Sequence, residues 1–154
     1  MALEIERKFL IRDDSWRDQA DEGTVYRQGY LCTGRGRTVR VRLAADRAWL
    51  TIKGKAEGLA RAEYEYPIPV DEAREILDLC LPTIIDKTRY LVEHAGWTWE
   101  VDIFHGENEG LIVAEVELDR ADAVVELPSW VGLEVSHDSR YKNSRLTSLP
   151  FSRW

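Results

Sequence analysis

Apolar and polar residues alternate along most of this chain with the two-residue period of β-strands. On the first such segment, Glu4, Glu6 and Lys8 share one face, and the apolar residues Leu3 and Ile5 share the other. Turn sequences rich in glycine separate many of the segments. The alternation predicts eight strands, over residues 3–11, 25–33, 37–44, 48–55, 62–70, 84–94, 97–104 and 111–118.

Helical patterns are fewer. Residues 71–79 begin with an acidic cap and carry an apolar stripe, and residues 119–127 predict a second helix that ends before Pro128. A short helix is predicted over 13–19, and the tail predicts a helix over 138–149. Because the 154 residues contain no internal repeat and no linker, we expect a single domain spanning the whole chain, 1–154.

Charges of like sign stand next to each other on the polar faces of these strands. A sheet with one solvent-exposed face would explain any single pair without a binding site. The repetition favours a binding site, because neighbouring like charges destabilise a sheet unless a ligand neutralises them. Basic groups bind phosphoryl oxygens and carboxylates hold hard cations, so the pattern indicates a polyphosphate bound with magnesium. The further pairs are Arg40 and Arg42, Glu63 and Glu65, Lys87 and Arg89, Glu100 and Asp102, and Glu115 and Glu117.

The apolar faces of the same strands also need to be buried. If the charged faces line the inside of a closed sheet, the apolar faces point outward and must be covered by helices. Closing the sheet removes its exposed edges, and eight strands form a small barrel that can hold one ligand. We therefore predict a mainly β (α+β) fold, an eight-stranded closed β-barrel with a few flanking helices.

The overall charge narrows the range of partners. At a net charge of −7, the chain is a poor default binder of nucleic acid or of anionic membranes, which need a basic surface. The sequence contains no apolar run of membrane-spanning length and no signal peptide, so we expect a cytoplasmic protein. The expected partner is a small molecule, and the sequence leaves open whether the protein is a monomer or a homodimer.

The order of the charged motifs also carries a family resemblance. The motifs are Glu4-Ile5-Glu6-Arg7-Lys8-Phe9-Leu10, Arg27-Gln28-Gly29-Tyr30-Leu31, Val39-Arg40-Val41-Arg42, Thr51-Ile52-Lys53, Glu63-Tyr64-Glu65, Lys87-Thr88-Arg89-Tyr90, Glu100-Val101-Asp102, Ala114-Glu115-Val116-Glu117 and Arg140-Tyr141-Lys142-Asn143. In this order they resemble the CYTH superfamily, the triphosphate tunnel metalloenzymes. The chain is most similar to the short bacterial members that hydrolyse inorganic tripolyphosphate.

The resemblance implies an eight-stranded antiparallel barrel that forms a tunnel, with a C-terminal helix at one tunnel mouth, and metal-dependent chemistry on a triphosphate. It implies Mg²⁺ or Mn²⁺ as the cofactor. From the C-terminal helix, Lys142, or less favourably Arg140, would reach a terminal phosphate. The implied phosphate-binding residues are Lys8, Arg40, Arg42, Lys53, Lys87, Arg89 and Lys142. The implied metal-binding residues are Glu4, Glu6, Glu63, Glu65, Asp102, Glu115 and Glu117.

The expected reaction is attack on the terminal phosphorus by a metal-positioned water, in which Glu4 and Glu6 hold a metal. A lysine among other cations loses its proton more easily, so Lys87 could act as a base. Tyr30 shares strand parity with Gln28 and could orient Lys87. The alternative is that Lys87 only contacts phosphate and Tyr30 only packs.

Other readings remain open on the sequence alone. Within enzymes, the substrate could be thiamine triphosphate or a nucleoside triphosphate, or the protein could cyclise ATP as class IV adenylate cyclases do. The same tunnel could also serve a non-catalytic sensor of polyphosphate or nucleotide. The last alternative is a solvated β-domain without a site.

Overall fold

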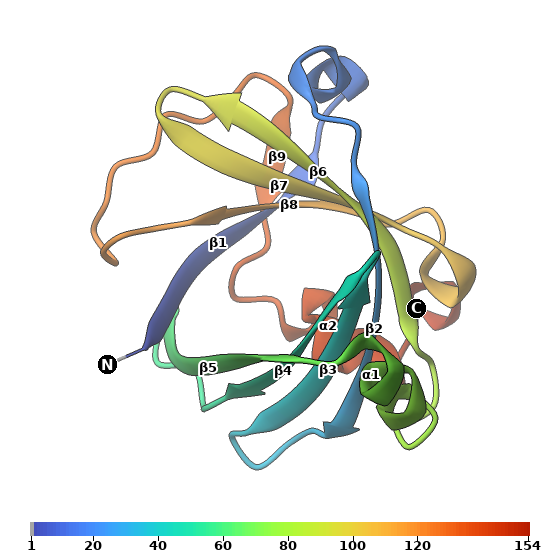
Figure 1. The fold of residues 1–154 in the computed structure, drawn as a ribbon. Coiled ribbons are helices and arrows are strands. Elements are labelled where there is room, and N and C mark those ends of the chain that lie inside the picture. Colours follow the sequence, from blue (N-terminus) through green and yellow to red (C-terminus); the bar gives the residue numbers. More distant parts are fainter. Residues whose placement is uncertain (1) are drawn as a thin grey trace.

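Eight antiparallel strands close into a barrel in the computed structural model, which describes residues 2–154 (Figure 1). The sheet order is β5-β4-β3-β2-β6-β7-β8-β1, and β1 pairs back to β5, so the predicted closed barrel is confirmed. A short ninth strand lies beside β1. The strands are β1 (Leu3–Ile11), β2 (Thr24–Cys32), β3 (Thr38–Ala44), β4 (Arg47–Lys53), β5 (Ala60–Ile68), β6 (Ile85–His94), β7 (Trp97–Phe104), β8 (Ile112–Glu117) and β9 (Val131–Glu134).

Strand β1 closes the barrel by pairing with both β8 and β5, and it also pairs with the additional strand β9. Its first residues pair with β5, with Leu3 opposite Ala62, and its last residues pair with β9, with Phe9 opposite Glu134. The sequence did not predict β9, which has only four residues and includes Gly132. A Cβ atom at Gly132 would lie 3.2 Å from the backbone oxygen of Leu10, so the close approach of the two chains favours glycine there.

The predicted helix over 71–79 is confirmed as α1 (Val70–Leu77), which begins after Pro69 and packs on β3 and β4. The predicted short helix over 13–19 is a 3₁₀-helix, η1 (Asp14–Gln19), in which the Asp13 side chain accepts from the Ser15 amide. Within residues 2–154, no helix has both the length and the apolar character needed to cross a membrane. The remaining short elements are η2 (Gly106–Asn108), η3 (Ser139–Tyr141), α2 (Asn143–Ser148) and η4 (Phe151–Arg153).

Two helix predictions are wrong. Residues 119–127 form no helix, because Val125 is buried while its neighbour Val124 is 90% exposed and no apolar stripe of helical period forms. The tail does not form one helix over 138–149. Lys142 has an extended backbone, with φ −68° and ψ 133°, and separates η3 from α2.

The outside of the barrel carries most of the apolar residues, as the alternation predicted. Phe9, Trp99 and Trp130 belong to a buried cluster on the outer face of β1, β6, β7 and β8. Three segments cover this cluster: η1, the irregular segment between β8 and β9, and β9 itself. The sequence predicted that helices alone would cover the barrel. A second cluster lies between α1 and the outer face of β3 and β4.

The inside of the barrel changes from charged to apolar along its strands. On β6, Lys87 and Arg89 share the inward parity of Ile85, and Ile85 packs with Tyr141 and Leu146 of the C-terminal segment. We call the end filled by this apolar cluster the closed end. Figure 1 shows α2 lying across the barrel interior. The full cluster is Ile85, Phe104, Leu111, Val113, Val135, Tyr141 and Leu146.

Candidate functional site

A charged cavity of about 380 Å³ occupies the barrel interior beyond the closed end. Side chains from β1 to β8 and from the C-terminal segment line it, because every second residue of each strand points inward. All but one of the predicted site residues therefore meet in one space. The predicted residues that line it are Glu4, Glu6, Lys8, Tyr30, Arg40, Arg42, Lys53, Glu63, Glu65, Lys87, Arg89, Glu115, Glu117 and Lys142.

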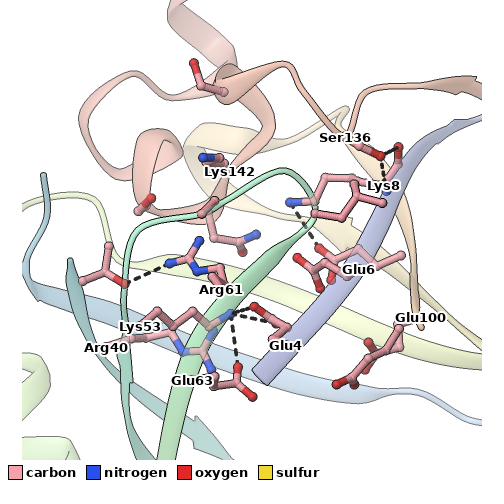
Figure 2. A pocket seen from close by; sticks show the side chains of 18 of the residues that line it. Glu4, Glu6, Lys8, Arg40, Lys53, Arg61, Glu63, Glu100, Ser136 and Lys142 are labelled. Atoms are coloured by element: carbon pink, nitrogen blue, oxygen red, sulfur yellow. Dashed lines mark hydrogen bonds and ion pairs between the residues drawn. The ribbon is translucent and has the colours of Figure 1, made fainter. Parts of the chain in front are cut away.

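Several of the basic side chains are already paired with carboxylates. Lys53 Nζ lies 2.9 Å from both carboxylate oxygens of Glu4 and 3.3 Å from Glu63 Oε2 (Figure 2). Lys8 Nζ lies 3.3 Å from Glu115 Oε1. The Lys8–Glu115 and Lys53–Glu63 pairs join adjacent strands, and the Lys53–Glu4 pair joins β4 to β1. The ion pairs position both lysines before any ligand enters.

Two arginines in the cavity keep donors free for an anion. The Nε groups of Arg40 and Arg61 are buried, and neither has a hydrogen-bond partner within residues 2–154. A buried unpaired N–H group costs about 1–3 kcal/mol, so both groups would gain from an acceptor such as a phosphate oxygen. This geometry supports anion binding at the arginine side of the cavity.

Asp102 is the one predicted site residue that does not line the cavity. It is fully buried, and its oxygens accept from Lys87 Nζ at 2.8 Å and from Arg89 Nε and Nη2 at 2.8 and 2.9 Å. Burial alone would raise the pKa of Asp102, but Arg89 and Lys87 hold it below its usual value. Asp102 thus holds two cations in position, and the metal-ligand role that the resemblance implied for it stays a prediction.

Lys87 is fully buried among charges of both signs. Burial, together with Arg89 and Arg42, lowers the pKa of Lys87 to about 7 despite the nearby carboxylate of Asp102. Its Nζ donates to Asp102 and to Asn143 Oδ1, the latter at 3.0 Å. A tetrahedral nitrogen then has one position left, which carries a proton in the ammonium form and a lone pair in the neutral form.

Tyr30 lines the cavity but does not hold Lys87 in the described chain. No hydrogen bond joins the two side chains among residues 2–154, and Tyr30 lies opposite Arg40 in the register of β2 and β3. The hydrogen bonds of Lys87 go to Asp102 and Asn143, and the orienting role of Tyr30 stays a prediction.

Glu6 and Glu117 have no ion-pair or hydrogen-bond partner on the side chains that the structure describes. Burial, Glu115 and Glu4 raise the pKa of Glu6 to about 8. Burial and the neighbouring carboxylates, with Glu4 the foremost, also raise the pKa of Glu117. Carboxylates crowded in this way are stabilised by a cation between them.

The carboxylate set fits a hard divalent cation that is shared with a ligand. No three His, Cys, Asp or Glu side chains of residues 2–154 converge closely enough to hold a metal ion alone. Mg²⁺ is typically bound by one or two carboxylates together with waters and substrate phosphates. Glu4, Glu6, Glu115 and Glu117, on adjacent strands β1 and β8, provide such a set.

The cavity lining also contains charged and polar residues that the sequence analysis did not assign to the site, among them Arg61, Glu100 and Asn143. Arg61 shares the strand parity of Glu63, so the same alternation could have found it. Glu100 was recognised as part of a charged pair, but only its partner Asp102 was assigned to the site. No local pattern marks Asn143, because its place depends on how the C-terminal segment docks.

The chain is similar over almost its whole length to proteins with an assigned activity. It is 48% identical over 155 residues to an inorganic triphosphatase of Acetivibrio thermocellus, covering 100% of this chain and 99% of the relative. It is 36% identical over 153 residues to an inorganic triphosphatase of Nitrosomonas europaea, covering 96% and 99%. A crystal structure of an inorganic triphosphatase has a TM-score of 0.66 and 32% identity, covering 93% of this chain and 96% of the other.

Family membership follows from a match over almost the whole sequence. The family model described as the CYTH domain matches residues 2–149. This range contains every charged motif on which the resemblance rested and all the predicted site residues. The chain therefore belongs to the CYTH domain family.

Proposed function

We propose that this protein hydrolyses the terminal phosphate of inorganic tripolyphosphate, producing pyrophosphate and phosphate. The observation that carries the proposal is the one cavity that brings a basic array together with a group of carboxylates, of which Glu6 and Glu117 have no side-chain partner among the described residues. The names of the two relatives support the same reaction. Membership of the CYTH family implies a divalent metal, and we propose that it is Mg²⁺ or Mn²⁺.

The cavity residues divide into two groups by charge. The metal, when bound, would neutralise phosphate oxygens and lower the pKa of an attacking water. We assign the metal to Glu4, Glu6, Glu115 and Glu117, with Glu63 and Glu65 on the neighbouring strand β5 as further candidates. The proposed phosphate contacts are Lys8, Arg40, Arg42, Lys53, Lys87, Arg89 and Lys142, to which the structure adds Arg61.

Positioning and charge neutralisation account for most of the catalysis in this proposal. Phosphoryl transfer needs little covalent chemistry from the protein, so prearranged donors around the phosphoryl oxygens supply the rate enhancement. Lys8 and Lys53 are held in place by carboxylates, and Arg89 is held by Asp102 and Glu100. These side chains need little reorganisation as charge develops on the leaving pyrophosphate.

Tripolyphosphate is expected to release phosphate faster than ATP or thiamine triphosphate. Among the described residues that line the cavity, Tyr30 is the only Phe, Tyr or Trp, so the lining offers little surface on which a base could stack. The measurement is phosphate release from the three compounds with Mg²⁺ or Mn²⁺, together with a search for cyclic nucleotide.

Each alternative reading predicts a different outcome of that assay. If phosphate were released faster from ATP or thiamine triphosphate, that compound would be the substrate in place of tripolyphosphate. Formation of cyclic AMP would indicate an adenylate cyclase. Binding without turnover in saturating magnesium would indicate a sensor. If tripolyphosphate with magnesium did not raise the melting temperature, the cavity would not be a binding site.

Lys87→Ala is expected to lower kcat and to remove the acidic limb of the pH–rate profile near pH 7. A general base must be unprotonated, so a Lys87 with a pKa of about 7 gains activity as the pH rises through 7. Lys142→Ala serves as the control, because Lys142 also lines the cavity and should affect KM without changing that limb. A raised KM with an unchanged maximal rate and pH profile in Lys87→Ala would identify a phosphate contact.

A further inference from the structure

One amide side chain joins the C-terminal segment to the basic array of the cavity. Asn143, the first residue of α2, accepts two hydrogen bonds at Oδ1. One comes from Lys87 Nζ and the other from Gln28 Nε2, each at 3.0 Å. Asn143 itself lines the cavity. It therefore lies at the contact between the closed end and the proposed phosphate site.

The contacts of Asn143 continue in both directions through buried groups. On one side, Arg42 Nε donates to Gln28 Oε1 at 2.8 Å. On the other side, Lys87 and Arg89 both donate to Asp102. Three proposed phosphate contacts, Arg42, Lys87 and Arg89, thus belong to one continuous hydrogen-bond chain with Asn143 near its middle.

The chemistry of the donors fixes the orientation of both amides. Guanidinium and ammonium groups can only donate, so Gln28 must turn its oxygen toward Arg42 and its NH₂ group toward Asn143. Asn143 must then present its oxygen, which Lys87 also requires. Gln28 is fully buried, so water does not replace a lost partner easily.

The apolar cluster of the closed end sets the place of Asn143. Leu146, on the same helix, is fully buried in that cluster with Ile85 and Phe104. The extended backbone at Lys142 ends η3 immediately before Asn143 and allows α2 to start at the wall formed by β2 and β6. Docking of the C-terminal segment therefore delivers the Asn143 oxygen to Lys87.

We propose that Asn143 is a positioning residue, through which docking of α2 holds Lys87 and, by way of Gln28, Arg42 in the orientation that serves the substrate. The kinetic form of this inference rests on the proposed triphosphatase function. Independently of turnover, Asn143 affects a bound triphosphate through Lys87 and not through the overall stability of the protein.

A double-mutant cycle tests this proposal. Asn143→Ala should lower kcat/KM for tripolyphosphate by about 10- to 100-fold, the loss typical of a removed outer-shell partner. In the Lys87→Ala background, the same change should add less than about threefold, because its target is gone. In the Lys53→Ala background the full loss should persist, since Lys53 pairs with Glu4 and Glu63 and shares no partner with Asn143. Equal losses in both backgrounds would overturn the proposal.

A second variant, Gln28→Glu, tests the hydrogen-bond chain without shortening a side chain. Gln28→Glu still accepts from Arg42 but cannot donate to Asn143, so the Asn143 amide must turn its NH₂ group to Glu and withdraw its oxygen from Lys87. Gln28 does not contact Lys87 directly, yet the loss in kcat/KM should again shrink in the Lys87→Ala background. The new carboxylate also repels the triphosphate near Arg42, so only the part of the loss that disappears in the Lys87→Ala background reports on Asn143. If no part of the loss disappears, the inference is contradicted even if Asn143→Ala fails to fold.

Ser148→Ala, an exposed change on the same helix, is the folding control and should leave both the melting temperature and kcat/KM unchanged. If the wild-type protein releases no phosphate from any triphosphate, the proposed function fails. The same cycle measured as tripolyphosphate affinity by calorimetry then still tests Asn143, because the dependence on Lys87 should appear in binding. Absence of that dependence in both measurements would show that Asn143 has only a structural role.

Discussion

Glutamine in place of Glu6 should reduce triphosphate hydrolysis by about 100-fold or more, the loss typical of a removed electrostatic group in an active site. Glutamine keeps the shape of the side chain but removes the charge that a divalent cation needs. It also removes the repulsion from Glu115 and Glu4 that, with burial, raises the pKa of Glu6 to about 8. In metal-free buffer at pH 8, Glu6→Gln should therefore be at least as stable as the wild type. Phosphate release and thermal unfolding measure the two effects.

The control for this variant is Arg7→Gln on the same strand. Arg7 has the outward parity and pairs with Glu134 at the surface, so its loss should leave hydrolysis unchanged. The equivalent glutamine variants of Glu4, Glu115 and Glu117 extend the test. Retention of most activity in all four glutamate variants would exclude the carboxylate group as a metal site. A large loss of stability in Glu6→Gln would mean that Glu6 serves the fold.

Asp102→Ala should lower the free energy of unfolding by about 3–5 kcal/mol, the typical cost of breaking a buried ion pair from one side. The substitution leaves Arg89 and Lys87 buried without the carboxylate that accepts from both. Hydrolysis should be lost as well, because both cations are proposed phosphate contacts. Chemical denaturation at neutral pH measures the change in stability.

Glu100→Ala is the matched control for Asp102→Ala. Glu100 also pairs with Arg89, at 2.7 Å, but its side chain is 28% exposed, and water can replace part of the lost contact. Its effect on the free energy of unfolding should therefore be clearly smaller. Equal effects of the two substitutions would show that Asp102 has no special role in holding the two cations.

The strands could be predicted well from the sequence because their signal is local. A period of two residues specifies which face of each strand is polar, and all eight predicted strands are found within a few residues of their expected bounds. The closed barrel followed from asking where the polar faces could go. Strand β9 escaped prediction because Gly132 interrupts any alternation in its four residues.

The errors concern features that depend on contacts distant in sequence. Residues 119–127 have helix-compatible composition, but only tertiary packing decides that Val125 is buried and Val124 exposed. The break at Lys142 arises where the C-terminal segment turns to dock on the closed end. Neither effect leaves a periodic trace in the sequence.

The site was predictable to the extent that it follows strand parity. The alternation along each strand correctly placed Glu4, Lys53 and Glu115 on the cavity side. The alternation does not show how deeply a side chain is buried in the barrel. Glu100 and Asp102 share a face, yet Glu100 lines the cavity and Asp102 lies fully buried against Arg89. Distinguishing these two residues requires the three-dimensional register.

The pairing of Lys53 with Glu4 and Glu63 has a consequence for thermodynamic linkage between ligands. A phosphate oxygen that takes Lys53 leaves Glu4 unpaired, and a cation that takes Glu4 leaves Lys53 free. Each event thus strengthens the other, and reciprocity requires the two enhancements of affinity to be equal. We therefore expect the internal ion pairs to favour binding of a charge-balanced metal–triphosphate unit over either component alone.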